Sequence, residues 1–350
     1  MFDFKIETDS DIPVSNQLFN QIRFAIASRQ FPPGHQLPST RQLAMQTGLH
    51  RNTISKVYRQ LEETGLVESK AGSGIYVRGQ ENQVGSKSPT LEKNPNTTHR
   101  AKTIVKSCLN ELLSQGCSLY NAREMFFKEI SWRLSCRNIL VTAPSNDIGI
   151  GELMAKELEE ALGNSVKVQL VPLEELDETI DKVFFFTTTI VTSRYFIGQA
   201  EKIAAKKNQS VRESIPEPVQ EAFLEPFRVI PVDIDDFSQE FELLKTLPKG
   251  SYCGLVSLSS GFLRAAEVII NGWRGNDVIV ITAQHIETEK INSMVRSAKI
   301  IVCDRFCFDK VKDALQKNRE DIIRPPEIRC IENYIRIDSI NLLKRELGLI

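Results

Sequence analysis

The chain has 350 residues, which is too long for one small module and predicts two or three domains. Hydrophobic residues make up 41% and charged residues 25% of the sequence, as in ordinary soluble globular proteins with a sizeable core. The N-terminal residues MFDFKIETDSDIPVSN lack the apolar segment and the cleavage site of a signal peptide. The longest apolar runs are far shorter than a membrane span. We therefore expect a cytoplasmic protein.

Charge is distributed unevenly along the chain. The net charge is −1, yet residues 12–80 contain eight basic and only three acidic residues, so the remainder is acidic overall. A basic module on an acidic body is typical of a polyanion-binding domain joined to a domain that does not bind nucleic acid. The alternative is an asymmetry that arose by chance.

Residues 12–78 contain three helical patterns in succession. The first begins at Pro13 and is stopped by a PPG motif. The second opens with Ser39 as its N-cap and ends at Gly48, which starts a tight turn. The third opens at His50 or Asn52 and buries an apolar stripe that includes Tyr58. Two short alternating strands, 66–69 and 75–78, then flank a glycine-containing hairpin loop.

The remaining sequence predicts a linker and a larger α/β domain. Residues 79–98 have almost no large apolar side chains and predict a flexible linker. Helices are expected at about 101–114 and 121–134. Beyond them, short apolar runs alternate with helical patterns, which predicts a doubly wound, mainly parallel sheet with helices on both faces. The predicted strands are 138–143, 166–171, 183–190, 228–232, 254–258, 278–282, 299–303 and 328–331.

We therefore divide the chain into a domain at 1–78, a linker at 79–98 and an α/β domain at 99–350. The α/β domain has the alternative of two lobes. The polar stretch 208–226, which holds three prolines, is the candidate hinge between them.

The segment FPPGHQLPSTRQLAMQTGLHRNTISKVYRQLEETGLVESKAGSGIYV, from Phe31, resembles the DNA-binding domain of the GntR family of bacterial regulators. The match consists of a PG-x-x-LPS-x-R-x-L-A opening, an R-N-T at the third helix, a Y-x-x-L-E-x-x-G-L-V join and a G-x-G wing. The resemblance implies a winged helix-turn-helix that binds double-stranded DNA as a transcription regulator.

The third helix carries one polar stripe beside its apolar stripe. The N-terminal residues of a recognition helix meet base edges in the major groove, where Arg can bind guanine and Asn can bind adenine. Arg41 and Lys56 are positioned for phosphate. The predicted DNA-binding residues are Ser39, Thr40, Arg41, His50, Arg51, Asn52, Thr53, Ser55, Lys56, Arg59, Lys70, Gly72, Ser73 and Gly74.

Each of these residues has a simpler alternative. Arg59 can instead pair with Glu62 or Glu63 at helical spacing. The wing glycines can serve only to shape the hairpin. Arg51 can be no more than a solvated charge, although the resemblance implies an Arg in the recognition helix at this position.

The chain as a whole resembles the PlmA branch, a GntR subgroup of cyanobacteria. The resemblance rests on the winged helix, the linker and the segments CRNILVTAPSNDIGIGELMAKEL, TTTIVTSRY and CGLVSLSSGFLRAAEVIINGW. It implies a C-terminal domain that forms a homodimer and receives signals through the nitrogen-signalling protein PII and its partner PipX. The strand pattern excludes the all-helical GntR branch. The aminotransferase-like branch is excluded as well, because it needs a much longer domain and a lysine that binds pyridoxal phosphate.

Polar residues follow several predicted strands and form a candidate effector cleft. Ligands of parallel α/β sheets bind at the carboxyl ends of the strands, where hydroxyls and helix N-termini accommodate anions. The alternative is ordinary helix capping by these side chains. The candidate cleft residues are Ser145, Asn146, Asp147, Thr187, Thr188, Thr189, Ser257, Ser259, Ser260 and Arg264.

We expect neither an enzyme nor a cofactor, because no HExxH, GxSxG, Walker or GxGxxG motif is present. Seven cysteines without a CxxC pair, beside four histidines, indicate reduced thiols and no bound metal. Cys303 and Cys307 are four apart and are candidates for a redox pair, against the alternative of buried structural thiols. The acidic residues Asp233, Asp235 and Asp236 fit a solvated loop better than a metal site.

Two hypotheses for the C-terminal domain remain. The domain either takes its signal from the protein partners PipX and PII or directly senses a small anionic metabolite. The candidate cleft offers neutral hydroxyls with only Arg264 as a cationic anchor, whereas firm anion sites supply several basic groups. The sequence therefore favours protein partners.

Overall fold

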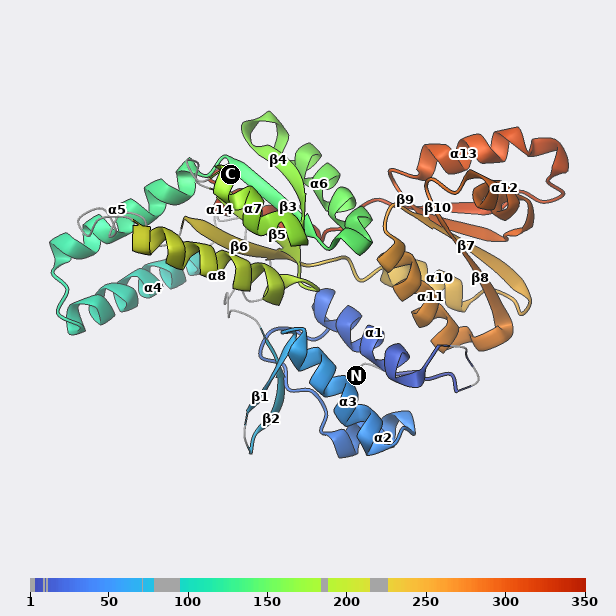
Figure 1. Cartoon of the computed structure of the whole chain (residues 1–350), viewed down its shortest axis with the longest axis horizontal. Helices are drawn as coiled ribbons and strands as arrows, with labels where there is room; N and C mark the ends of the chain where they lie inside the picture. The colour runs from blue at the N-terminus through green and yellow to red at the C-terminus, as the bar shows by residue number, and fades with distance from the viewer. Residues whose placement is uncertain are drawn as a thin grey trace.

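The computed structural model describes residues 4–8, 10, 12–70, 72–78, 95–183, 188–214 and 226–350, with only the backbone of 95–98, 183, 214 and 276. Figure 1 shows a small N-terminal domain, a helical hairpin that projects from one side, and a body of two α/β lobes. The N-terminal domain lies beneath the body, against the region where the two lobes meet.

The N-terminal domain is a winged helix-turn-helix, as the sequence predicts. Its helices bury one apolar stripe each around a shared core, to which the third helix contributes Ile54, Val57 and Leu61. The two wing strands pair antiparallel with Val67 opposite Val77. The elements are α1 (Val14–Ala27), α2 (Thr40–Thr47), α3 (Arg51–Glu63), β1 (Val67–Lys70) and β2 (Gly74–Val77).

The helical hairpin consists of α4 (Pro95–Ser114) and α5 (Leu119–Ser135). The helices are joined by a turn in which Gly116 has a φ of 87° and Ser118 caps α5 by accepting a hydrogen bond from the Asn121 amide at 3.1 Å. The expected start near residue 101 is wrong, because α4 begins at Pro95, a residue that suits the first turn of a helix. The last residues of the predicted linker are therefore helical, and 79–94 lie outside the described residues.

The first lobe is a four-stranded, fully parallel sheet with the order β4-β3-β5-β6. Apolar β3 is buried at nearly every position, as expected for a central strand covered on both faces. The elements are β3 (Asn138–Ala143), α6 (Ile148–Leu162), β4 (Lys167–Pro172), α7 (Leu176–Val183), β5 (Thr188–Ser193), α8 (Ile197–Ser214) and β6 (Phe227–Val232).

The second lobe repeats this arrangement with the order β10-β9-β7-β8, also fully parallel. Counted along the chain, both lobes have their second strand at one edge and their fourth at the other. The elements are α10 (Ser238–Lys245), β7 (Ser251–Ser257), α11 (Ser260–Arg274), β8 (Val278–Gln284), α12 (Thr288–Ser297), β9 (Ile300–Asp304), α13 (Phe308–Lys317) and β10 (Glu327–Ile331). The parallel α/β prediction and its two-lobed alternative are confirmed.

Two crossing segments join the lobes, at 233–237 and 332–336. They pair through an antiparallel bridge between Ile234 and Ile335. The final helix, α14 (Ile337–Glu346), then returns to the first lobe and packs on α6 and β6. The two lobes share one hydrophobic core, to which α1 of the N-terminal domain adds Phe24 and Ala27.

The hinge predicted at 208–226 is wrong. Residues 208–214 continue α8, and the Asn208 side chain bonds both the amide and the carbonyl of Phe227, at 3.0 and 2.8 Å. This segment therefore leads into β6 within the first lobe, and the chain changes lobe only after Val232. Polarity and proline content mark surface exposure, but they do not reveal to which sheet the next strand belongs. In the part of the chain that is described, no helix is long and apolar enough to span a membrane.

Candidate nucleic-acid interface and the lobe junction

The turn between α2 and α3 is fixed by local capping. Ser39 and Gln42 form a reciprocal capping box at the start of α2, with the Ser39 hydroxyl accepting from the Gln42 amide at 3.2 Å. Gly48 ends α2 in a left-handed conformation with a φ of 71°. His50 then caps α3, its Nδ1 accepting from the Asn52 amide at 3.2 Å. These local caps set where α2 ends and where α3 begins.

Helix α3 presents its polar stripe to solvent. Tyr58 is buried as expected, and its hydroxyl donates to the Pro38 carbonyl at 2.5 Å, which ties α3 to the start of α2. Burial raises the pKa of the Tyr58 phenol well above its ordinary value. Of the predicted DNA-binding residues, only Thr40 and Thr53 are half-buried. The exposed ones are Ser39, Arg41, His50, Arg51, Asn52, Ser55, Lys56, Arg59, Lys70, Gly72, Ser73 and Gly74.

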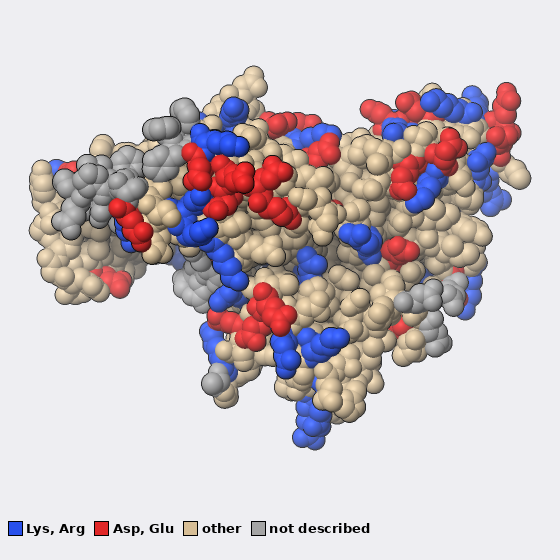
Figure 2. Space-filling model, viewed as in Figure 1, with Lys and Arg blue, Asp and Glu red and all other residues tan. Residues whose placement is uncertain are grey.

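Among the cationic side chains of this face, Lys70 pairs with Glu68 at 3.1 Å, and those on α3 are exposed. Within the described ranges, Arg59 forms no ion pair with Glu62 or Glu63, and the Glu62 carboxylate instead accepts from the Ser69 amide at 3.1 Å. Figure 2 shows Lys and Arg side chains at the lower end of the N-terminal domain, where Figure 1 places α2 and α3. The arrangement supplies both donors for base edges and charges for phosphates.

The wing tip is held close to the helices by one side chain. Gln36 donates to the Ser73 carbonyl at 2.7 Å. Gly74 has a φ of 122°, a backbone conformation that favours glycine, and a Cβ here would displace the end of the Gln36 side chain, whose Nε2 would lie 2.8 Å away. Gly72 has a φ of 73° with open space around it. The wing glycines therefore do shape the hairpin, and the same geometry leaves the backbone of the tip exposed.

Helix α1 fastens the N-terminal domain to the body. The Phe24 ring packs against Phe237 and Phe241, with centroids 6.4 and 5.7 Å apart. The Ala27 carbonyl accepts from the Ile234 amide at 3.1 Å, which connects the end of α1 to a crossing segment between the lobes. Because this segment links the lobes, the position of the DNA-binding domain on the body depends on the relative arrangement of the two lobes.

Asp233 is the centre of a buried ionic cluster at this point. Its carboxylate pairs with Arg29 of the N-terminal domain at 2.8 Å and with Arg194 at the end of β5, and it accepts from the Ser339 hydroxyl at 3.2 Å. Asp233 is only 5% exposed, so the expected solvated loop is wrong for this residue. No group of three or more potential metal ligands occurs among the described residues.

The candidate effector cleft is closed where its two sides meet. Asp147, after β3, accepts from the Ser259 hydroxyl at 2.9 Å and from the Gly261 amide at 3.0 Å, both at the start of α11. A Cβ on Gly149 would overlap the carbonyl of Leu258. The first lobe therefore caps a helix of the second, and burial raises the pKa of the Asp147 carboxyl.

Several cleft residues have other positions than predicted. Thr188 and Thr189 begin β5 and lie at the amino edge of the sheet, whereas Val183, the expected start of this strand, ends helix α7. Thr187 lies outside the described residues. The Ser145 hydroxyl donates to Glu174 at 2.7 Å within the first lobe. A periodic apolar pattern gives the existence of a strand more reliably than its ends.

The remaining cleft residues serve helix starts or face solvent. Ser259 caps α11, and the Ser257 hydroxyl accepts from the Ser259 amide at 3.1 Å. Ser260 is the first residue of α11, and both Asn146 and Arg264 are exposed. These contacts are those of the helix-capping alternative.

The predicted cysteine pair is buried in the second lobe. Cys303 belongs to β9 and Cys307 caps α13, so they do not share the first turns of one helix. Both are fully buried, and burial raises the pKa of each thiol far above its ordinary value. Because the thiolate is the reactive form, these are the properties of inert structural thiols.

Glu157 is a buried acid that the sequence did not single out. It lies on α6, and its carboxylate accepts from the amides of Tyr334 and Ile335, at 2.5 and 2.9 Å, in the second crossing segment. Burial raises its pKa to about 7. Its charge lies in the middle of an amphipathic helix, and nothing in that pattern indicates a partner 177 residues away.

Comparisons with known proteins agree with this arrangement. Residues 14–77 match the family model of bacterial regulatory proteins of the gntR family, and residues 239–332 match that of the cyanobacterial PlmA-type GntR regulator C-terminal domain. The chain thus carries a DNA-binding domain of the GntR family at residues 14–77. Within this family, its C-terminal part is of the PlmA type.

The curated relatives match about a fifth of this chain. The HTH-type regulator YhcF of Bacillus subtilis is 35% identical over 68 residues, which is 19% of this chain and 56% of the relative. The transcriptional repressor YtrA of the same organism is 34% identical over 73 residues, 21% of this chain and 56% of the relative. The chain therefore spans little more than half the length of these relatives.

Solved structures also match part of this chain. YtrA from Sulfolobus acidocaldarius is 25% identical, with 31% of this chain and 99% of that chain covered and a TM-score of 0.21. The AraR DNA-binding domain, solved in complex with operator ORE1, is 27% identical, with 22% of this chain and 94% of that chain covered and a TM-score of 0.19.

Proposed function

We propose that this protein binds a two-fold symmetric DNA operator as a homodimer and reads it with α3. The observation that carries the proposal is the exposed polar stripe of α3, which includes Arg51, Asn52 and Lys56. The N-terminal residues of α3 would meet base edges, while Arg41, Lys56 and Lys70 would meet phosphates. The protein would act in the cytoplasm, where the DNA is.

The hairpin of α4 and α5 supports a homodimer. It stands away from the body in Figure 1, and the only described residue of α5 that is buried within it is Ala122. Exposed fractions reach 61% for Ile104, 67% for Phe127 and 54% for Ile130, which is unusual for so many neighbouring large apolar side chains. A second copy of the same hairpin would cover this surface, and a symmetric dimer matches a symmetric operator.

An operator selected from random duplexes tests DNA recognition. The full chain should enrich a nearly palindromic sequence and bind it at least ~1,000-fold more tightly than unrelated DNA in a gel-shift titration at physiological salt. Equal affinity for all duplexes would overturn sequence-specific binding.

The proposed signal is delivered by protein partners, PipX bridged to PII. The support is the PlmA-type match of residues 239–332, because the resemblance to that branch implies these partners. A pull-down of purified PipX, with and without PII, by the full chain tests it. Retention of PipX supports the proposal, and loss of PipX at micromolar concentrations of both proteins overturns it.

The second candidate is direct sensing of a small anionic metabolite by the C-terminal domain. The closed contact between Asp147 and α11 disfavours the cleft first predicted for it. A separate cavity, which lies beside the contact between Asp147 and α11, favours a different position for a metabolite site.

A further inference from the structure

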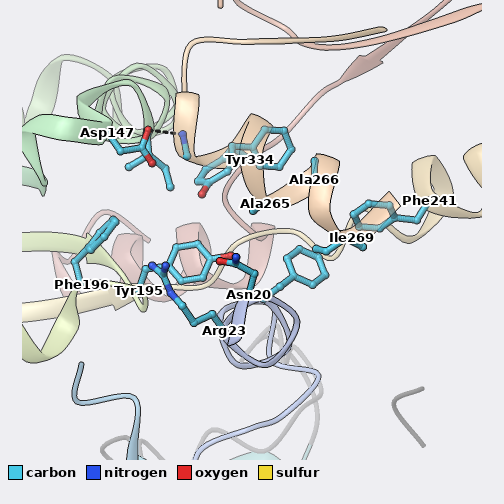
Figure 3. Close-up of a pocket in the computed structure, with 14 residues that line it drawn as sticks. Asn20, Arg23, Asp147, Tyr195, Phe196, Phe241, Ala265, Ala266, Ile269 and Tyr334 are labelled. Atoms are coloured by element: carbon cyan, nitrogen blue, oxygen red, sulfur yellow. Dashed lines mark hydrogen bonds between the residues drawn. The ribbon is translucent and has the colours of Figure 1, made fainter. Parts of the chain in front are cut away.

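A small cavity lies where the N-terminal domain meets both lobes, with a volume of about 70 Å³ (Figure 3). Helix α1 forms its floor, the two lobes form its sides, and the second crossing segment contributes Tyr334. The polar side chains of its wall are Asn20, Arg23, Asp147, Tyr195 and Tyr334. Of the cleft residues predicted from sequence, the wall includes only Asp147.

Two hydrogen-bond donors of this wall are buried without an acceptor among the described residues. They are Nε of Arg23 and the hydroxyl of Tyr334, a residue that is only 3% exposed. Figure 3 shows the Arg23 side chain beneath Tyr195 and the Tyr334 hydroxyl directed toward the same space from above. Buried donors without acceptors destabilise a protein, so one acceptor group placed between them would satisfy both.

The wall of the cavity carries one cation and one anion, Arg23 and Asp147, which limits a ligand to at most one negative group. The Arg23 guanidinium lies 4.6 Å from the Tyr195 ring centroid, and burial lowers its pKa. An anion beside it would stabilise its charged form. Asp147, the only other charged residue of the described wall, already accepts from Ser259 and Gly261. Its charge disfavours a second anionic group on the ligand.

The size of the cavity limits the ligand further. A water molecule needs roughly 10–15 Å³ of such volume, so about 70 Å³ holds roughly five to seven non-hydrogen atoms. The rest of the wall is apolar and largely aromatic, with Phe24, Phe196, Phe241 and Phe262. A short hydrocarbon chain fits this part, whereas a sugar phosphate or a larger dicarboxylate does not.

We propose that this cavity binds a small monocarboxylate, with its carboxylate between Arg23 and the Tyr334 hydroxyl and its short chain against the aromatic wall. The site itself is independent of the proposed DNA-binding function, and only its consequence rests on that function. Because one wall is helix α1, the ligand would hold the DNA-binding domain against both lobes and change its affinity for the operator.

Calorimetry on the purified full chain tests the site without DNA. Acetate, butyrate and pyruvate are the probes, with butyramide as the uncharged analogue of butyrate and with 2-oxoglutarate and inorganic phosphate as larger or differently shaped anions. We expect at least one monocarboxylate to bind with a dissociation constant below about 1 mM, and butyramide at least ~10-fold more weakly. Tighter binding of phosphate or 2-oxoglutarate, or no binding of any monocarboxylate, overturns the proposal.

Variants locate the bound carboxylate. Tyr334→Phe retains the ring and removes only the hydroxyl, and Arg23→Gln removes the charge. Each should weaken binding about 10-fold or more. Arg319→Gln is the matched control, because Arg319 is an exposed cation of the second lobe that lies outside the wall. Circular dichroism confirms that each variant is folded. Unchanged affinity in folded Tyr334→Phe overturns this position of the ligand.

A gel-shift titration with and without the monocarboxylate then tests whether the ligand changes the affinity of the protein for its operator. A change in operator affinity in the wild type that is absent in Tyr334→Phe supports the coupling. Ligand binding by calorimetry without any change in operator affinity retains the site and overturns the coupling, so failure of the DNA-binding proposal remains distinguishable from failure of the site.

Discussion

At the scale of single residues, the DNA-facing side chains separate into two kinds. Arg51 and Asn52 begin α3, where base edges are reached, whereas Lys56 lies one turn further along the exposed side. A base contact carries sequence information, and a phosphate contact carries only charge. Substitutions at the two kinds of position should therefore differ in their effect on specificity and on salt dependence.

Arg51→Ala should weaken operator binding by about 1–3 kcal/mol and relax discrimination at one base position. Lys56→Ala should weaken binding to all sequences similarly and reduce the slope of affinity against salt by about one unit. Gel-shift titrations at several salt concentrations measure both effects. If Arg51→Ala leaves affinity and specificity intact, the placement of the recognition helix is wrong.

Glu157 should make the stability of the body depend on pH. Burial raises its pKa from 4.5 to about 7, so the folded protein binds this proton more tightly than the unfolded chain does. Stability should consequently fall as the pH rises from about 4.5 to 7, by up to about 3 kcal/mol for this group. Urea unfolding across this pH range measures the effect.

Glu157→Gln removes the ionisable group and should flatten this part of the pH profile. Glu159→Gln is the matched control, because Glu159 lies on the same helix and is exposed. The Glu159 variant should retain the wild-type slope. Equal slopes in all three proteins would show that Glu157 does not titrate in this window.

At the scale of elements, the α4–α5 hairpin has large apolar side chains that the rest of the described chain does not cover. Its base is fixed to the first lobe, where Arg133 of α5 and Arg228 of β6 both pair with Glu346, at 2.8 and 2.7 Å. Within the described ranges, the outer part of the hairpin forms no such ion pair with the lobes. An isolated helix of this length is only marginally stable in water. A partner hairpin would supply the missing apolar contacts.

Phe127→Lys should therefore break the proposed dimer. The substitution occurs twice in a symmetric interface, so the dimer dissociation constant should rise about 100-fold or more. Sedimentation velocity of the wild type and the variant measures it. Ile323→Lys replaces a fully exposed apolar residue of the second lobe and should leave the dimer intact. A monomeric wild type would contradict the role given to the hairpin.

At the scale of the whole molecule, the three parts meet at one junction. Asp233 joins Arg29 of the N-terminal domain to Arg194 of the first lobe, and Asp147 joins that lobe to α11 of the second. Breaking one partner of a buried ion pair leaves an uncompensated charge, so the junction stabilises one relative arrangement of the parts. A signal that reaches either lobe can therefore reach the DNA-binding domain through α1.

The sequence by itself determined what depends on near neighbours. The Ser39 cap, the turn at Gly48, the apolar stripe of α3 and the alternating wing strands all follow from residues a few positions apart. The parallel α/β class likewise follows from the alternation of buried strands and amphipathic helices. These patterns depend on residues close together in the chain, so they can be recognised in a single sequence.

Only the tertiary structure decided which distant residues meet. The ends of β5, the crossing of the chain between lobes after β6, and the meeting of Glu157 with Tyr334 depend on contacts across many tens of residues. The same holds for Arg23, which belongs to a core helix of the DNA-binding domain and yet lines a cavity of the body. A buried charge acquires its role from its surroundings, and the packing of separate elements sets those surroundings.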